Sequence, residues 1–191
     1  VMRYLIFIMF LGVFYVGIST AGALTVGEQA PVFSLEDQSG SVVNLSDYKD
    51  NVVVLEWINP DCPYVQRHYK EGTMKKLSEK YNKKIVWLAI NSTHYMDNKV
   101  NSQWRNKYLL EYAILNDNGG DVGKSYGAKT TPHMFIIDNS TVVYAGAIDD
   151  DKWGRSAKRV NYVDIGLAEI LNGGAVTTSE TKPYGCSVKY K

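Results

Sequence analysis

The chain has 191 residues, of which 45% are hydrophobic and 21% are charged, a composition typical of one globular domain and not of a disordered segment. Its 21 basic residues nearly balance its 20 acidic residues, so no excess charge indicates nucleic acid as a partner. Two cysteines and three scattered histidines exclude a disulfide-stapled miniprotein and the usual structural zinc sites. We therefore expect no metal and no cofactor.

Residues 1–23 have the pattern of a secretory signal peptide. Arg3 precedes an apolar run over residues 5–18, and Ala21 and Ala23 match a small-x-small cleavage site. The run is shorter than the roughly 20 residues that a membrane-spanning helix needs. We expect a cleaved signal, an exported protein that is periplasmic or secreted, and no stable membrane insertion; an uncleaved anchor is the lesser alternative.

The first half of the remaining chain predicts a hairpin followed by a parallel strand-helix-strand unit. Residues 32–50 alternate apolar and polar side chains around an Asp-Gln-Ser-Gly turn, which predicts a β-hairpin. The continuous apolar runs 51–57 and 85–90 are typical of strands buried on both faces. Between them one apolar stripe predicts a helix, weakened at Gly72 by up to about 1 kcal/mol. Two such strands joined by a helix form a right-handed crossover.

The second half predicts further helices, a second hairpin and a tail. Helices are expected over 97–108, 121–126 and 162–171, and a short strand over 113–115. The apolar runs 133–137 and 142–147 flank a polar turn and predict an antiparallel hairpin. The fold class is α/β, with one domain over residues 24–172 and a flexible C-terminal tail over 173–191.

Cys62 is the principal candidate for a reactive group. It follows a buried strand and precedes a predicted helix, where backbone amides and the helix dipole stabilise a thiolate. Pro63 suits the first helical position. A buried structural cysteine is the alternative, but the prolines on either side disfavour a regular buried element. Asp61 opposes a reactive thiol, because its negative charge is expected to raise the pKa of Cys62.

The pair Thr131-Pro132 lies just before a predicted strand. A proline in this position suits a cis peptide bond, which leaves nearby backbone groups free to pair with an extended substrate. Most peptide bonds before proline are trans, so this feature alone is weak evidence.

Taken in order, the segments APVFSLEDQSG, VNLSDYKDNVVVLEW, the cysteine turn, KSYGAKTTPHMFIID and VVYAGAID resemble the thioredoxin fold of exported redoxins. These redoxins belong to the alkyl hydroperoxide reductase/thiol-specific antioxidant superfamily, alongside the cytochrome c maturation thioredoxins. The resemblance covers nearly all of residues 24–172. It implies a central mixed sheet flanked by helices, with Cys62 as the reactive thiol and Pro132 as a cis-proline facing it.

Two departures from this family pattern affect the chemistry. Thioredoxins carry a second cysteine three residues after the first, where this chain has Val65, so a local disulfide is impossible. Peroxiredoxins carry Thr three residues and Pro seven residues before their cysteine, where this chain has Asn59 and Leu55. Asn59 remains a candidate hydrogen-bond donor to substrate.

Cys186 is the only other sulfur able to resolve a mixed disulfide or sulfenic acid on Cys62. It lies in the predicted tail beside Gly185, and some redoxin-like proteins with a similar cysteine turn carry a similar GCSxK ending. A free tail cysteine, or one paired between subunits, is the alternative.

Other polar and aromatic residues are weaker candidates. Tyr64, inside the cysteine turn, is a candidate for lining the site together with Thr131. His133 could favour the Cys62 thiolate, although a histidine packed within a strand is the favoured interpretation. Arg67, His68 and the acidic run 149–151 are expected in solvent.

The sequence thus predicts an exported thiol-disulfide oxidoreductase in which Cys62 attacks and Cys186 resolves. Its partners would be a protein or small-molecule disulfide and an unidentified thiol reductant, with no nucleic acid. The first alternative is a thiol peroxidase that uses the same pair on a peroxide. The second is a non-catalytic binding or metal-chaperone module, holding copper through Cys62 and His133.

Overall fold

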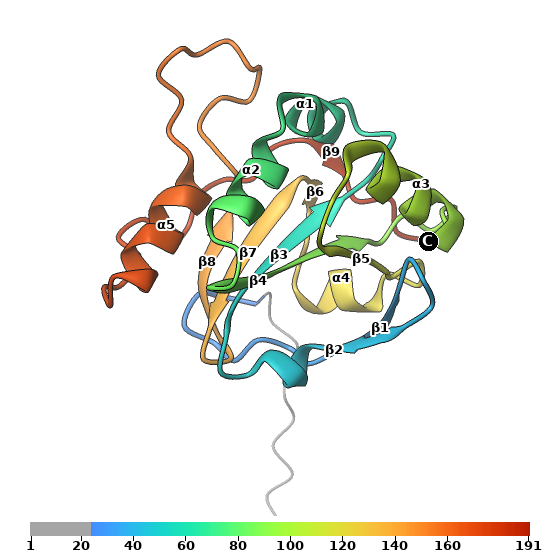
Figure 1. Cartoon of the computed structure of the whole chain (residues 1–191), viewed down its shortest axis with the longest axis horizontal. Coiled ribbons are helices and arrows are strands. Elements are labelled where there is room, and N and C mark those ends of the chain that lie inside the picture. Colours follow the sequence, from blue (N-terminus) through green and yellow to red (C-terminus); the bar gives the residue numbers. More distant parts are fainter. Residues whose placement is uncertain (1–23) are drawn as a thin grey trace, which may run out of the picture.

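The computed structural model describes residues 24–191, so the predicted signal peptide lies outside the described residues (Figure 1). Within this range, seven strands form one sheet in the order β2-β1-β5-β4-β3-β7-β8. They are β1 (Ser34–Asp37), β2 (Val42–Asn44), β3 (Val52–Ile58), β4 (Ile85–Asn91), β5 (Ala113–Asn116), β7 (His133–Asp138) and β8 (Thr141–Gly146). The short strands β6 (Thr130–Thr131) and β9 (Cys186–Ser187) pair only with each other.

The helices are α1 (Pro63–Glu71), α2 (Thr73–Lys80), α3 (Asn98–Tyr108), α4 (Asp121–Ser125) and α5 (Tyr162–Leu171), with a 3-10 turn η1 (Leu45–Tyr48). In the part of the chain that the structure describes, none of them is long and apolar enough to cross a membrane.

The sheet is mixed, as predicted. Strands β3, β4 and β5 run parallel, whereas β1 and β7 run antiparallel to their neighbours on either side of this parallel centre. The predicted N-terminal hairpin is confirmed as β1 and β2, whose turn is closed by the Asp37 carboxylate accepting from the backbone N–H groups of Ser39 and Ser41 at 2.7 and 3.0 Å.

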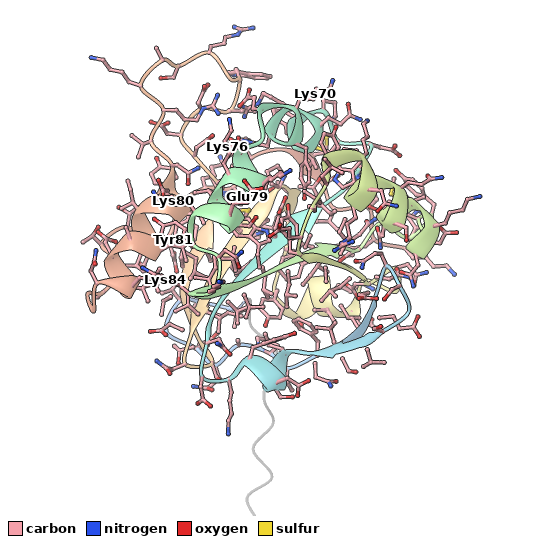
Figure 2. The ribbon with its side chains drawn as sticks, viewed as in Figure 1. Lys70, Lys76, Glu79, Lys80, Tyr81 and Lys84 are labelled. Atoms are coloured by element: carbon pink, nitrogen blue, oxygen red, sulfur yellow. The ribbon has the colours of Figure 1, made fainter. Side chains whose placement is uncertain are left out.

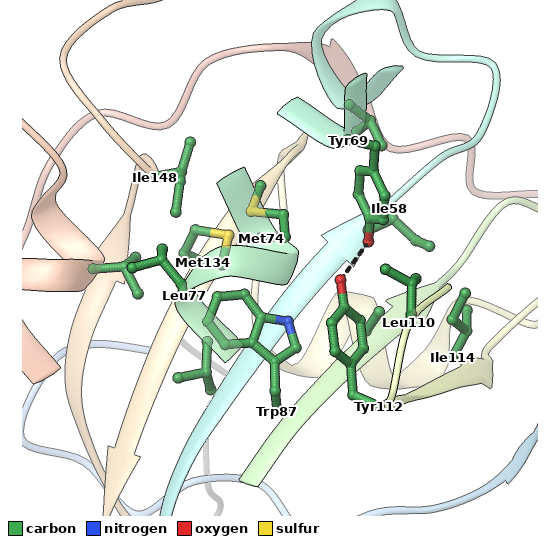
Figure 3. Close-up of a cluster of buried hydrophobic side chains, with 14 of the residues drawn as sticks. Ile58, Tyr69, Met74, Leu77, Trp87, Leu110, Tyr112, Ile114, Met134 and Ile148 are labelled. Atoms are coloured by element: carbon green, nitrogen blue, oxygen red, sulfur yellow. Dashed lines mark hydrogen bonds between the residues drawn. The ribbon is translucent and has the colours of Figure 1, made fainter. Parts of the chain in front are cut away.

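The central strand β3 is buried on both faces because helices cover the sheet on both sides. Alternate residues Val54 and Ile58 pack toward α1, α2, α3 and α5, and Figure 3 shows part of this cluster with Trp87 at its centre. The intervening residues Leu55 and Trp57 pack toward α4, η1 and the N-terminal segment. Since β3 delivers the chain to Cys62, the turn that carries this cysteine starts from the most rigid part of the fold.

The single helix expected after Cys62 is broken in two at Gly72. This residue has φ +72°, a left-handed conformation that glycine adopts without steric cost, and its N–H donates to carbonyls at the end of α1. Tyr81, labelled in Figure 2, follows the second piece, α2. Its hydroxyl donates to the Asp164 carboxylate of α5 at 2.6 Å. Lys80 pairs with the same carboxylate.

The tail over residues 173–191, which we expected to be flexible, is bound along the domain. Backbone hydrogen bonds join Ala145 of β8 to Ser179 and Thr181 at 3.0 and 3.1 Å. Nearer the end of the chain, the Tyr190 hydroxyl donates to the Ala128 carbonyl at 2.8 Å. The tail therefore crosses the mouth of α1 along a defined path, visible as the red strand near α1 in Figure 1.

Glu56 is a fully buried carboxyl group on β3. It shares the face of Val54 and Ile58, and the indole N–H of Trp87 donates to its Oε2 at 3.0 Å. Burial raises the pKa of Glu56 to about 7, against hydrogen bonds from Trp87 and Tyr69 that lower it. The folded state therefore binds a proton here more tightly than the unfolded chain does.

We predict that the native chain loses stability as pH rises and Glu56 ionises. The variant Glu56→Gln, which cannot ionise at this position, should not show this loss. The pKa of Glu56 is about 7 in the folded state and 4.5 ordinarily, so the native free energy of unfolding should fall across this interval by up to roughly 3 kcal/mol relative to the variant. Denaturant unfolding of both proteins at several pH values measures the difference.

The comparison with the variant is essential because two buried histidines act in the opposite direction. Burial lowers the pKa of His68 to about 3 and that of His133 to about 4, so both stabilise the fold increasingly as pH rises toward 6.5. These contributions cancel in the difference between the two proteins. If the difference in the free energy of unfolding between the native chain and Glu56→Gln stays constant from acid to neutral pH, the raised pKa of Glu56 is contradicted.

Candidate active site

The turn that presents Cys62 is shaped by Asn59. Its side-chain oxygen accepts from the backbone N–H of Asp61 at 2.8 Å, and its carbonyl accepts from the N–H of Cys62 at 2.9 Å. The Gln66 amide closes the turn from α1 by donating to the Pro60 carbonyl at 2.8 Å. Cys62 itself is the residue before the first helical position, which Pro63 occupies as predicted.

The segment before β7 lies against the Cys62 sulfur. The Thr131-Pro132 peptide bond is cis, as the sequence predicts, and the Thr131 carbonyl lies 3.0 Å from Cys62 Sγ, within reach of the thiol proton. Thr131 belongs to β6, which pairs antiparallel with β9 so that Thr131 stands opposite Cys186. A ladder of only two residues per strand thus places Cys186 of the tail beside Cys62.

The surroundings of Cys62 favour its thiolate. Burial alone raises the pKa of this thiol, but hydrogen bonds from the Cys186 thiol, from Thr131 and from the backbone N–H groups of Val65 and Cys186 outweigh it and lower the pKa below its ordinary value. The Thr131 hydroxyl is buried without a hydrogen-bond partner among the described residues, so it is free to donate to the sulfur.

Contrary to the expectation from the sequence, the negative charge of Asp61 does not raise the pKa of Cys62 above its ordinary value. Its carboxylate turns outward to accept from the Tyr95 hydroxyl at 3.1 Å, so the donors around Cys62 decide the direction of the shift.

The pKa of Cys186 shifts in the opposite direction. Burial and the neighbouring Cys62 sulfur raise the pKa of Cys186 to about 11, although Lys189 opposes this rise. Two adjacent thiols cannot both ionise easily, because the second negative charge would form beside the first. As pH rises, Cys62 is therefore the first of the two sulfurs to lose its proton, and Cys186 keeps its own. Both cysteines are free in this structure.

Tyr64 lies at the rim of the site. Its ring centroid is 6.0 Å from that of Tyr184 and 5.9 Å from that of Trp153. Together with Pro63 and Lys152 it lines a shallow, mostly apolar pocket beside the start of α1.

His133 does not join the site. It lies on β7 opposite Trp57, with its ring 4.5 Å from that of Phe135, on the face of the sheet away from the Cys62 cluster. Its Nδ1 accepts from the backbone N–H of Lys129 at 3.3 Å, and burial keeps the pKa of the ring at about 4. Packing within the strand is confirmed, and the pairing of Cys62 with His133 that a copper site would need is not formed.

The expectation that Arg67, His68 and the acidic run 149–151 lie in solvent is wrong. His68 and Asp149 are fully buried, Asp151 is almost so, and only Asp150 of the run is exposed. Tyr184 of the tail covers Arg67, His68 and Asp149, whereas Asp151 accepts from the backbone N–H groups of Arg155 and Ser156. No local periodicity signals either contact. Among residues 24–191, no group of three or more acidic, cysteine or histidine side chains is placed to hold a metal.

Comparison with known proteins agrees with this architecture. A model of the AhpC/TSA family matches residues 26–145. The thiol-disulfide oxidoreductase ResA of Bacillus thuringiensis subsp. konkukian is 28% identical over 115 residues, which cover 60% of this chain and 65% of ResA, less than two thirds of its length. A chloroplastic peroxiredoxin Q of Oryza sativa subsp. japonica is 26% identical over 133 residues, covering 64% of this chain and 58% of that protein.

A solved structure extends the likeness to nearly the whole chain. A hypothetical protein of Sinorhizobium meliloti 1021 superimposes with a TM-score of 0.80 at 25% identity, covering 89% of this chain and 97% of that one. The fold and the cysteine turn define a thioredoxin-like redoxin. The chain belongs to the AhpC/TSA family.

We predict that the Cys62 thiolate depends on the donor at position 186. Cys186→Ala removes the hydrogen bond from the neighbouring thiol and should raise the pKa of Cys62, whereas Cys186→Ser keeps a hydroxyl donor and should raise it less. Titration of the thiolate ultraviolet absorbance measures both variants. Equal pKa values in Cys186→Ala and in the native chain would show that position 186 does not influence the sulfur.

Proposed function

We propose that the protein is a thiol-disulfide oxidoreductase in which Cys62 attacks a disulfide and Cys186 resolves the product. The observation that carries this proposal is the β6–β9 ladder, which sets Cys186 opposite Thr131 while the Thr131 carbonyl lies 3.0 Å from Cys62 Sγ; the pKa of Cys62 is lowered and that of Cys186 raised in this arrangement. The thiolate is the nucleophile in disulfide exchange, so the sulfur with the lowered pKa attacks first. The sulfur with the raised pKa stays protonated until it is needed.

The exchange has two steps. The Cys62 thiolate attacks one sulfur of the substrate disulfide, forming a mixed disulfide and releasing the other sulfur as a thiolate. Cys186 then gives its proton to the departing substrate sulfur and attacks Cys62 Sγ, which breaks the mixed disulfide. The substrate has gained two electrons, and a Cys62–Cys186 disulfide remains. Two thiols of an unidentified reductant return the pair to its reduced form.

The other site residues shape and line this centre. Thr131 offers its carbonyl to the Cys62 thiol and its free hydroxyl to the thiolate. Pro132 fixes the direction of the chain beside it. Asn59 sets the geometry of the turn, with its side chain almost fully buried, and Tyr64 forms part of the rim that a substrate meets.

The proposed partners are a protein or small-molecule disulfide as substrate and a thiol as reductant, without nucleic acid. The pattern in residues 1–23 supports an exported protein, periplasmic or secreted, without stable insertion in the membrane. An oxidising compartment suits a chain whose working state includes a disulfide. We also propose that residues 24–172 and the tail over 173–191 act as one catalytic unit.

A thiol peroxidase is the second candidate function, favoured by the likeness to peroxiredoxin Q. In this reaction the Cys62 thiolate attacks one peroxide oxygen, becomes a sulfenic acid and releases the other oxygen as an alcohol or water. Cys186 then condenses with the sulfenic acid, releasing water and leaving the same disulfide. Asn59 and Leu55 stand where the peroxiredoxin pattern has Thr and Pro, so the disulfide substrate is preferred.

Substitution of the two cysteines should block different steps of the reaction. Cys62→Ser should abolish turnover of a small aromatic disulfide with a monothiol reductant. Cys186→Ser, mixed with the disulfide in the absence of reductant, should form the first mixed disulfide and then stall, so that a substrate half remains bound to Cys62. Release of the chromophoric thiol measures turnover, and intact mass identifies the trapped adduct. Turnover at the native rate by Cys62→Ser would refute the proposed role.

Hydrogen peroxide distinguishes the second candidate function. The reduced native protein should react with the disulfide faster than with peroxide, measured as loss of free thiols under the same conditions. Rapid loss of peroxide that is abolished by Cys62→Ser, together with a slow disulfide reaction, would assign the protein as a peroxidase.

A further inference from the structure

Tyr184, two residues before Cys186, is fixed by a polar network that the redox chemistry does not use. Its hydroxyl donates to Asp149 Oδ1, accepts from Arg67 Nη2 at 3.2 Å and lies 2.9 Å from His68 Nε2. Its ring also contacts those of Tyr64 and His68, with centroids 6.0 and 6.2 Å away. A single side chain of the tail thus makes contacts with α1 and with the loop that follows β8.

The partners of Tyr184 are buried and held in place. His68 and Asp149 have no exposed surface, and Asp149 Oδ2 lies 3.4 Å from Arg159 Nε. Arg67 Nη2 donates to the Asp151 carbonyl at 2.9 Å. A buried carboxylate needs its donors, because leaving it without them costs the full desolvation penalty. The hydroxyl of Tyr184 is therefore energetically important although it lies on the tail.

Gly185 allows the tail to pass close to the active site immediately after Tyr184. Its φ is +138°, and a Cβ atom there would lie 2.0 Å from the Thr131 carbonyl oxygen. No side chain fits in this space, since that oxygen belongs to the backbone of β6. The close approach lets Cys186 pair with Thr131, and Cys62 beneath is only 1% exposed.

We propose that Tyr184 is a positioning residue, a latch whose contacts with Asp149 and His68 hold Cys186 against Cys62. This proposal rests on the proposed function, in which the contact between Cys186 and Cys62 resolves the mixed disulfide. With the latch closed, the tail covers the Cys62 thiolate and brings the resolving thiol to it. With the latch open, Cys62 is accessible to a disulfide substrate. Tyr184 touches neither sulfur and takes no part in bond making.

The first test measures access to Cys62 in the reduced, full chain. Iodoacetamide modification of Cys62, followed by peptide mass, reports how often the tail lifts. Tyr184→Phe should speed this modification at least about tenfold, since the hydrogen bonds of the hydroxyl to Asp149 and Arg67 are lost. The matched control is Tyr81→Phe, which loses a tyrosine–aspartate hydrogen bond to Asp164 that involves no residue of the tail and should leave the rate unchanged.

Gly185→Ala provides a second variant, which removes no hydrogen-bonding group of the Tyr184 network. The added methyl group would collide with the Thr131 carbonyl, so this variant should also speed the modification of Cys62. A native rate in Tyr184→Phe would overturn the proposal, and so would an equal increase in Tyr81→Phe. Both measurements use reduced protein, so they stand even if the proposed enzymatic function fails.

A second readout reports positioning and not mere stability. In buffers of reduced and oxidised glutathione, Tyr184→Phe should lower the equilibrium constant for the Cys62–Cys186 disulfide by the factor by which it lowers the closed fraction of the reduced tail, which is smaller than the change in access. An unchanged constant together with a native rate of Cys62 modification would refute the latch. Absence of any such disulfide in the native chain would instead refute the proposed function and leave the access test to decide the role of Tyr184.

Discussion

The backbone pairing of Thr131 with Cys186 is the contact on which the arrangement of the site depends. Cys62 is fixed by the central strand and by α1, but its partner lies 124 positions later, beyond the last helix. The two-residue ladder between β6 and β9 closes that separation. Such a short ladder would be weak alone, and contacts on both sides of it, at Tyr184 and at Tyr190, hold the tail in register.

The pairing also explains how the pKa of Cys62 is lowered without a cation beside it. The groups that lower its pKa are hydrogen-bond donors: the Cys186 thiol, Thr131, and the backbone N–H groups of Val65 and Cys186. Two of the donors come from the tail itself. The segment that carries Cys186 therefore also stabilises the Cys62 thiolate, so in the proposed function the attacking and resolving roles both depend on one structural element.

The sequence predicts the body of the fold well because the body obeys local rules. The continuous apolar run of β3, the turn with Pro63 and the proline after Thr131 each have a short-range physical cause, and the structure places them as expected. The lysine-bearing helix α2 separates from α1 because one glycine adopts φ +72°, a possibility that composition alone leaves open.

The tail could not be predicted in the same way. Its Ser- and Thr-rich sequence has no apolar period, and its order comes from contacts with residues far away in the chain. His68 and Asp149 were expected in solvent because their burial depends on that unpredicted path. Cys186 could be nominated as a partner only from the scarcity of sulfur and from the resemblance of its GCSxK ending to that of some redoxin-like proteins. Its meeting with Cys62 is a property of tertiary structure.

The most direct test of this account is the disulfide map of the oxidised protein. The chain should be oxidised with a mild disulfide reagent, digested without reduction and analysed by mass spectrometry at low protein concentration. The account predicts one peptide that joins Cys62 to Cys186 within a single chain. Oxidised protein in which Cys62 is modified while Cys186 remains a free thiol would contradict it.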